Sequence, residues 1–116
     1  MKIACKKIHK MQPEAIILKG GHLTTRKLVD IVFSENKFFE FHSKKINTKN
    51  THGTGCTLSS AIATYYSLGK TLKKSCEMAI KYVNHAISSG PKYGKGHGPI
   101  NHLNIMNIDK RFKWKM

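Results

Sequence analysis

Acidic residues are scarce in this sequence: six Asp and Glu side chains stand against 21 Lys and Arg, for a formal net charge of +15. Such a charge is typical of proteins that bind nucleic acid or anionic membranes. Arginine, which proteins prefer for contacting phosphates and bases, is nevertheless confined to Arg26 and Arg111. The lysines are dispersed along the chain, and no RNA-binding aromatic motif accompanies them. The composition therefore favours a solvated basic surface over a nucleic-acid interface.

Long apolar runs and paired cysteines are missing as well. No stretch approaches the length that crosses a bilayer, and residues 1–7 lack the apolar region of a signal peptide. Cys5, Cys56 and Cys76 are an odd number without a Cys-x-x-Cys pair, which argues against a disulfide framework or a cysteine zinc site. The seven histidines are scattered. We therefore expect a cytoplasmic protein with no membrane contact and no metal held by its own side chains.

The apolar segments that are present predict an α/β domain. Residues 15–18 are an uninterrupted apolar strand, as expected where both faces of a parallel sheet are covered. Residues 28–33 and 38–42 predict a hairpin, in which Phe38 belongs to the core. The remaining expected elements are a helix at 2–11, a short strand at 45–48, a helix from about 57 to 68, and a helix from Thr71 to Gly90 with Cys76 on its apolar face.

A glycine-rich turn stands at the centre of the chain, where Gly53, Thr54, Gly55 and Cys56 run directly into an apolar segment with the composition of a buried helix. Such a turn leaves backbone N–H groups unpaired at the positive end of a helix, which is an arrangement that binds phosphate. Cys56 lies where a thiolate is favoured. Alone, however, Gly-Thr-Gly is equally well explained as a tight turn.

Lys19 follows the first strand and precedes Gly20 and Gly21. Glycines at the end of a strand place the next loop over the edge where α/β proteins bind ligands. Two interpretations of Lys19 remain open, a surface lysine at a strand end and a cation beside a bound phosphate.

Three segments in order carry a resemblance to a known family. Residues 48–63 closely resemble the signature of the hydroxymethylpyrimidine/phosphomethylpyrimidine kinases of thiamine biosynthesis, in the ribokinase-like superfamily, and residues 17–22 and 96–102 match further motifs. The resemblance covers only the C-terminal half of such an enzyme. It implies the C-terminal part of a ribokinase-like three-layer fold in residues 1–102, with few strands including a hairpin, packed by helices. Residues 103–116 are expected to be a basic C-terminal tail.

The resemblance also implies a reaction, in which ATP and Mg²⁺ serve to phosphorylate 4-amino-5-hydroxymethyl-2-methylpyrimidine and then its monophosphate. By this resemblance Gly53, Thr54, Gly55 and Cys56 form the anion hole, Cys56 is the general base, and Lys19 lies close to the nucleotide phosphates. In the family, the N-terminal half supplies much of the pyrimidine pocket and the acidic groups associated with magnesium. The implied partner is therefore a separate N-terminal-half polypeptide or a second copy of the chain.

Two alternatives stay open. Some relatives that share the Gly-Thr-Gly-Cys turn are pyridoxal kinases, so the substrate could be pyridoxal instead of the pyrimidine. The other alternative is a non-catalytic basic remnant domain that binds anions or nucleic acid through its charge.

Overall fold

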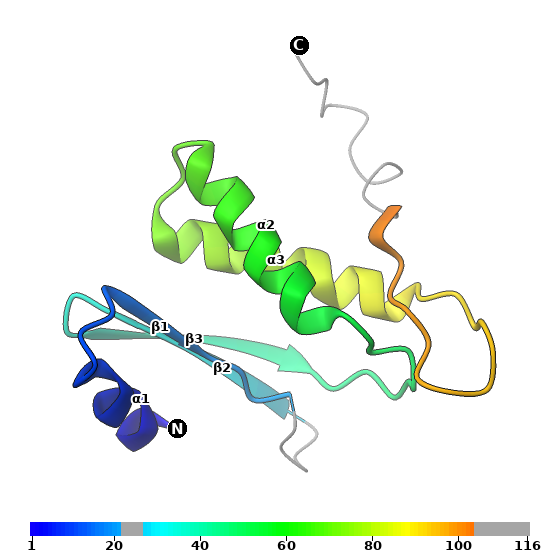
Figure 1. Cartoon of the computed structure of the whole chain (residues 1–116), viewed down its shortest axis with the longest axis horizontal. Helices are drawn as coiled ribbons and strands as arrows, with labels where there is room; N and C mark the ends of the chain where they lie inside the picture. Colours follow the sequence, from blue (N-terminus) through cyan, green and yellow to red (C-terminus); the bar gives the residue numbers. More distant parts are fainter. Residues whose placement is uncertain (22–26, 104–116) are drawn as a thin grey trace. The chain divides into compact units, whose positions relative to one another are not determined.

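The computed structural model describes residues 1–21 and 27–103, and by its contacts the chain divides into two compact units, Met1–Lys45 and Ile46–Met116. The first unit contains α1 (Lys2–His9), β1 (Ala15–Leu18), β2 (Lys27–Ser34) and β3 (Lys37–Lys44), and the second contains α2 (Thr54–Ser67) and α3 (Leu72–Ser88) (Figure 1). His22, which belongs to the first matching motif, lies outside the described residues. So does the expected basic tail, apart from Leu103.

The first unit is built on a three-stranded sheet in the order β1-β2-β3. Glu35 and Asn36 connect β2 to β3 with positive φ angles of 49° and 59°, which is the backbone of the two-residue turns that best match the twist of a hairpin. The predicted hairpin is confirmed. The apolar run at residues 15–18 predicts parallel pairing. In the described part of the chain this prediction is wrong, because β1 pairs antiparallel with β2. An apolar run specifies burial on both faces of a strand but not its direction.

The core of the first unit lies between α1 and the sheet. Cys5 is fully buried there together with Ile16, Ile31 and Phe33, and Phe38 packs against this cluster. The rings of Phe33 and Phe38 lie 4.6 Å apart between centroids. The core role predicted for Phe38 is therefore confirmed.

The second unit is a pair of helices, in which α2 packs against α3. Thr71 caps α3 by accepting a hydrogen bond from the backbone N–H of Lys74. Cys76 is fully buried, and this burial raises the pKa of its thiol to about 11. The prediction of a core thiol is thus confirmed. The other buried apolar side chains of the two helices are Leu58, Ile62, Ala79, Ile80, Val83 and Ala86.

Two expected boundaries differ from the structure. Residues 45–48 form no strand: β3 ends just before them at Lys44, and the next β contact along the chain is an isolated parallel bridge between His52 and Pro99. The helix expected from about 57 begins at Thr54, so that Gly55 lies inside its first turn. Glycine has a low helix propensity, so a prediction from propensity alone places the start of the helix after Gly55.

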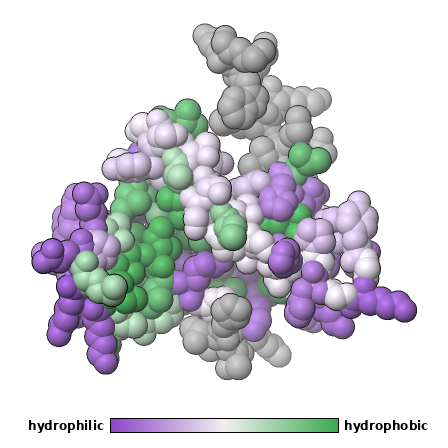
Figure 2. Space-filling model, in the orientation of Figure 1, coloured by the Kyte–Doolittle hydropathy of each residue, from purple (hydrophilic) through white to green (hydrophobic). Residues whose placement is uncertain are grey.

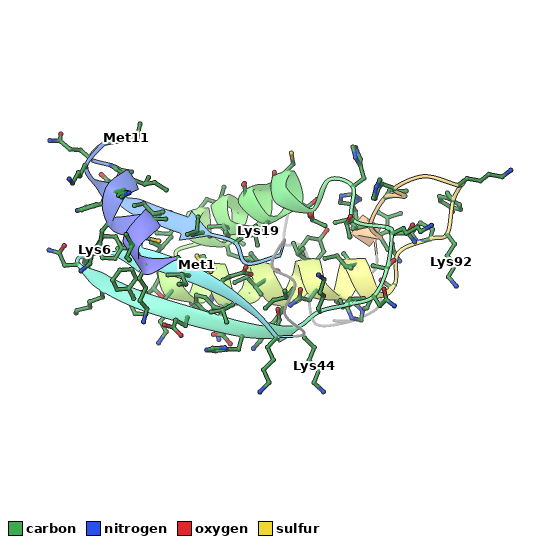
Figure 3. All side chains as sticks on the ribbon, turned by 90° about the horizontal axis from the view of Figure 1, so that it is seen from below. Met1, Lys6, Met11, Lys19, Lys44 and Lys92 are labelled. Atoms are coloured by element: carbon green, nitrogen blue, oxygen red, sulfur yellow. The ribbon has the colours of Figure 1, made fainter. Side chains whose placement is uncertain are left out.

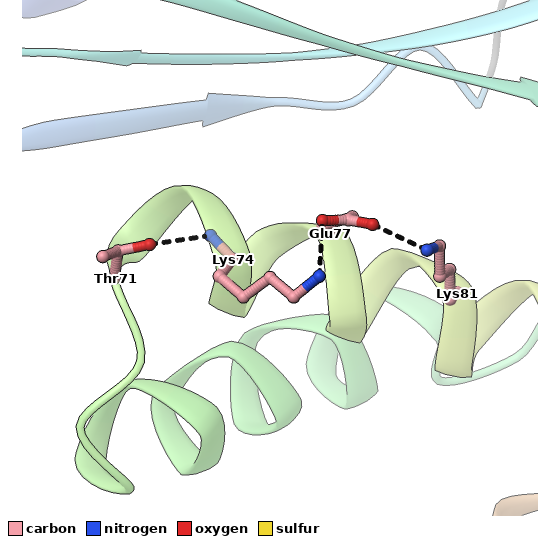
Figure 4. A network of polar contacts seen from close by, with 4 residues as sticks. All are labelled: Thr71, Lys74, Glu77 and Lys81. Atoms are coloured by element: carbon pink, nitrogen blue, oxygen red, sulfur yellow. Dashed lines mark hydrogen bonds and ion pairs between the residues drawn. The ribbon is translucent and has the colours of Figure 1, made fainter.

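On the exposed side of α3, Glu77 is held by two lysines (Figure 4). Its carboxylate accepts hydrogen bonds from Lys81 Nζ at 2.6 Å and Lys74 Nζ at 3.1 Å, one turn away on either side. These bonds, Lys81 first, lower the pKa of Glu77 to about 2. The chain has few carboxylates, and Glu77 partly offsets the positive charge of these two lysines.

Acid should weaken this unit through Glu77. Because the folded-state pKa of about 2 lies below the ordinary value of 4.5, the stabilisation is complete above about pH 4.5 and is lost as the pH falls toward 2. We expect the melting temperature of the Glu77→Gln variant to fall less steeply over this range than that of the parent. Glu35→Gln, in the exposed hairpin turn, is the matched control and should keep the parent slope. Equal slopes for Glu77→Gln and the parent would contradict the assignment.

Candidate anion-binding site

The start of α2 has the backbone geometry of an anion-binding turn. Gly53 is the N-cap residue, with a left-handed backbone at φ 82°, and no side chain caps the helix. The Thr57 N–H donates to the Gly53 carbonyl at 2.9 Å, and the Thr54 N–H makes only a long contact of 3.4 Å with the Thr51 carbonyl. The N–H groups of Gly55 and Cys56 precede the first regular helical bond, so α2 offers them no acceptor. They point at one region with the positive end of the helix behind them.

The two glycines of this turn differ in what the fold requires of them. Gly53 has a positive φ, which side chains rarely tolerate, although a Cβ there would meet no atom within 4 Å. Gly55 has no positive φ, and a Cβ there would also meet nothing within 4 Å. The fold therefore requires glycine at 53 but not at 55. The missing side chain at Gly55 keeps the approach to the first-turn amides open.

A loop from beyond α3 docks beside this turn. The His52 N–H donates to the Gly98 carbonyl at 3.2 Å, next to the parallel bridge between His52 and Pro99. A Cβ on Gly98 would lie 2.3 Å from Oδ1 of Asn50, so a side chain there would displace the Asn50 side chain. The second and third matching motifs, residues 48–63 and 96–102, therefore form one structure.

Thr57 and His102 join the same loop to the helix itself. Thr57 Oγ1 lies 3.0 Å from His102 Nε2, and the Tyr82 hydroxyl of α3 donates to the His102 carbonyl at 3.0 Å. Sequence reasoning assigned no role to these three residues. Thr57 and His102 both stand in matching motifs, but no pattern in the sequence indicates that they touch.

Cys56 lies in the first turn of α2 and is exposed, unlike Cys5 and Cys76. Its position at the start of a helix agrees with the sequence-based expectation. Cys56 is therefore the one of the three cysteines, all of them in the described part of the chain, that solvent reaches.

Lys19 belongs to the first unit and is described within it. It is exposed and follows β1 directly, as expected. The next residue is anchored, because the Gly20 N–H donates to Oδ1 of the buried Asp30 at 2.9 Å. A Cβ on Gly20 would lie 2.4 Å from the Val29 carbonyl oxygen, so glycine is required there. The backbone at Lys19 is thus held firmly while its ammonium group remains in solvent.

The described residues do not supply a metal site of their own. Among residues 1–21 and 27–103, no three His, Cys, Asp or Glu side chains are grouped so as to hold a metal ion. Mg²⁺ prefers carboxylates and phosphate oxygens. Mg²⁺ would therefore find better ligands in the phosphates of a bound nucleotide than in the side chains of the described residues.

The basic residues are spread over the described surface. Lys6, Lys19 and Lys44 are exposed and come from α1, the end of β1 and the end of β3, while Lys92 lies in the loop after α3 (Figure 3). Hydrophilic residues appear at several separate places on the face shown in Figure 2. Their dispersal agrees with a solvated basic surface. Of the helices in the described part, none is long and apolar enough to cross a bilayer.

Pyridoxal kinases are among the solved structures that this chain resembles. The pyridoxal kinase of Staphylococcus aureus, in complex with AMP-PCP and pyridoxal, matches 94% of this chain with a TM-score of 0.88 and 29% identity. The chain covers 41% of that protein. The expected fold, the C-terminal part of a ribokinase-like α/β kinase, is confirmed by such likenesses.

The sequence comparisons agree and are more specific. The model of the phosphomethylpyrimidine kinase family matches residues 1–101, and the chain belongs to this family. It is 44% identical over 103 residues to the thiamine biosynthesis bifunctional protein ThiED of Geobacter sulfurreducens. It is 35% identical over 103 residues to the hydroxymethylpyrimidine/phosphomethylpyrimidine kinase of Bacillus subtilis. These matches cover 89% and 88% of this chain, which spans only 21% and 38% of the two relatives.

The two glycines of the turn should respond oppositely to alanine. Gly53→Ala places a side chain at a positive φ and should destabilise the second unit by about 1–2 kcal/mol. Gly55→Ala removes a flexible residue from a helical turn and should stabilise it by about 0.5–1 kcal/mol. Urea unfolding of both variants measures the difference. Equal destabilisation would show that the fold, not a ligand, requires Gly55.

The three thiols should differ in reactivity. Cys56 is exposed whereas Cys5 and Cys76 are fully buried, and the pKa of Cys76 is raised to about 11. Brief treatment of the native chain with iodoacetamide at mildly alkaline pH should label Cys56 alone. Mass spectrometry locates the label, and denaturant should expose the other two. Labelling of Cys76 before Cys56 would contradict the structure.

Proposed function

We propose that this chain provides the phosphate-binding and proton-accepting part of a hydroxymethylpyrimidine/phosphomethylpyrimidine kinase that works in the cytoplasm. The observation that carries the proposal is the start of α2, where unpaired amides, an unobstructed Gly55 and an exposed Cys56 converge. Membership of the phosphomethylpyrimidine kinase family supports the substrate class. The reaction transfers the γ-phosphoryl group of ATP to the hydroxymethyl group of the pyrimidine, and then to the resulting monophosphate.

Each residue of the turn has a distinct role in this proposal. The amides of Gly53, Thr54, Gly55 and Cys56 form the anion hole that stabilises charge on the moving phosphoryl group. The Cys56 thiolate accepts the proton of the substrate hydroxyl while the hydroxyl oxygen bonds to phosphorus and ADP leaves. Lys19 contributes a positive charge near the nucleotide phosphates. Mg²⁺ would supply positive charge against the phosphates when bound with ATP, and none of the described residues forms a group of side chains that would hold it without the nucleotide.

The chain acts together with further protein in this proposal. It spans 38% of the Bacillus subtilis kinase, and its described residues include no group of three His, Cys, Asp or Glu side chains that could hold a metal ion. We therefore assign the remaining pyrimidine and magnesium contacts to a separate N-terminal-half polypeptide or to a second copy of the chain. Because the basic side chains are dispersed, nucleic acid is not the partner that we propose.

A pyridoxal kinase is the second candidate. The observation that favours it is the likeness to the Staphylococcus aureus pyridoxal kinase at a TM-score of 0.88. Hydroxymethylpyrimidine and pyridoxal both present a hydroxymethyl group on a ring, so the start of α2 serves either reaction. Comparing kcat/KM for the two substrates in the active assembly distinguishes them.

Turnover by the active assembly with ATP, Mg²⁺ and hydroxymethylpyrimidine tests the role of Cys56. The Cys56→Ala variant should lose about a hundredfold or more in kcat, because it removes the general base. Gly55→Ala should also lose activity although it folds, because its methyl group obstructs the anion hole. Ser67→Ala, in the last turn of α2, removes an exposed hydroxyl bonded to the Thr64 carbonyl, far along the helix from the turn, and is the matched control.

An unchanged kcat in Cys56→Ala would overturn the role of Cys56 as the base. Full activity in Gly55→Ala would overturn the anion hole. If no assembly turns over ATP and the chain binds random DNA with a steep salt dependence, the non-catalytic remnant is the correct alternative.

A further inference from the structure

Three hydrogen bonds run in series through the second unit and end at the N-cap of α2. The Tyr82 hydroxyl donates to the His102 carbonyl at 3.0 Å, and His102 Nε2 lies 3.0 Å from Thr57 Oγ1. Thr57 Oγ1 in turn donates to the Gly53 carbonyl at 2.8 Å. The series therefore connects α3, the loop after it and the first turn of α2.

The direction of the middle bond follows from the chemistry of the hydroxyl group. A threonine hydroxyl has one hydrogen, and that of Thr57 points to the Gly53 carbonyl. Thr57 Oγ1 can therefore only accept from His102, so the imidazole carries a hydrogen on Nε2 and donates it. Donation to Thr57 polarises its hydroxyl and strengthens the bond to Gly53.

The bond to Gly53 bears on the amides that form the anion hole. The Gly53 carbonyl accepts from both the Thr57 N–H at 2.9 Å and the Thr57 hydroxyl at 2.8 Å. This carbonyl belongs to the same peptide group as the Thr54 N–H. Holding the carbonyl therefore fixes the direction of that N–H and the entry of the chain into the first turn. Such a restraint matters at Gly53, whose φ is 82°, because glycine has no side chain to restrict its backbone.

We propose that His102 is a positioning residue of the anion hole, which through Thr57 fixes the Gly53–Thr54 peptide and with it the entry into the first turn of α2, where the Gly55 and Cys56 amides lie. The proposal rests on the proposed function of residues 53–56. His102 itself touches neither the phosphate nor the substrate in this account. Its effect is to reduce the reorganisation that the amides undergo when an anion binds.

The variants follow from the geometry. His102→Leu removes the donor, whereas His102→Gln places an amide N–H close to the position of Nε2 and should restore the bond. Thr57→Val removes the hydroxyl. His97→Leu is the matched control, because His97 belongs to the same loop but its Nδ1 lies 3.3 Å from the Lys49 carbonyl and not beside Thr57.

Amide hydrogen exchange of the full chain, followed by NMR in phosphate-free buffer, tests the bond series itself. The Thr57 amide should exchange about tenfold faster in His102→Leu, since one supporting hydrogen bond is lost, and at the parent rate in His102→Gln and His97→Leu. Unchanged exchange in His102→Leu would overturn the proposal. General acceleration across α3 in that variant would assign His102 a purely structural role and overturn it also.

Titration with inorganic pyrophosphate, followed at the Gly55 and Cys56 amides, tests the link to anion binding. His102→Leu should bind about tenfold more weakly than the parent, with rescue by His102→Gln, and should have little further effect in a Thr57→Val background. Additive losses in the double variant, or no rescue by glutamine, would overturn the role of His102 alone. A parent chain whose Gly55 and Cys56 amides do not respond to pyrophosphate would instead overturn the anion hole, and with it the proposed function.

Discussion

At Gly53 the chain enters α2 through a left-handed residue whose carbonyl accepts two hydrogen bonds from Thr57. The rest of the candidate site depends on this conformation, because it determines where the first-turn amides point. A side chain at Gly53 would oppose it sterically. The usual N-capping side chain is also missing, which leaves the amides of Gly55 and Cys56 available to a ligand. In the proposed function, the bound anion takes the place of a capping side chain.

The surroundings of Gly53 are built from segments far apart in the sequence. The loop at Gly98 lies against the Asn50 side chain, and its backbone pairs with His52. Cys56 is thereby presented on a turn that is held from two sides. In the first unit, Asp30 fixes the backbone at Gly20 in a similar manner and leaves the preceding Lys19 free to point into solvent. Both arrangements combine a rigid backbone with an exposed reactive or charged group.

Local patterns in the sequence were sufficient for most of the fold. Alternating and continuous apolar runs located β1, β2 and β3, and Thr71 marked the start of α3. The antiparallel direction of β1 depends on pairing across the chain and is not contained in a run of four apolar residues. The start of α2 was placed too late because Gly55 is a poor helix former, although in the structure it occupies a regular helical position. The turn from Gly53 to Cys56 was identified correctly, whereas the contact between Thr57 and His102 had no local signal.

The contact between Thr57 and His102 joins residues that are 45 positions apart. Closing so long a segment has an entropic cost that local helix formation does not carry. During folding, α2 and α3 can therefore form and pair before the loop returns to the start of α2, so the site is completed late. In the proposed function, an anion would bind more tightly to molecules that have finished this step, and binding would shift the population toward the completed fold. Because the loop that carries His102 completes the site, the affinity for the ligand would also indicate whether this last stage of folding has taken place.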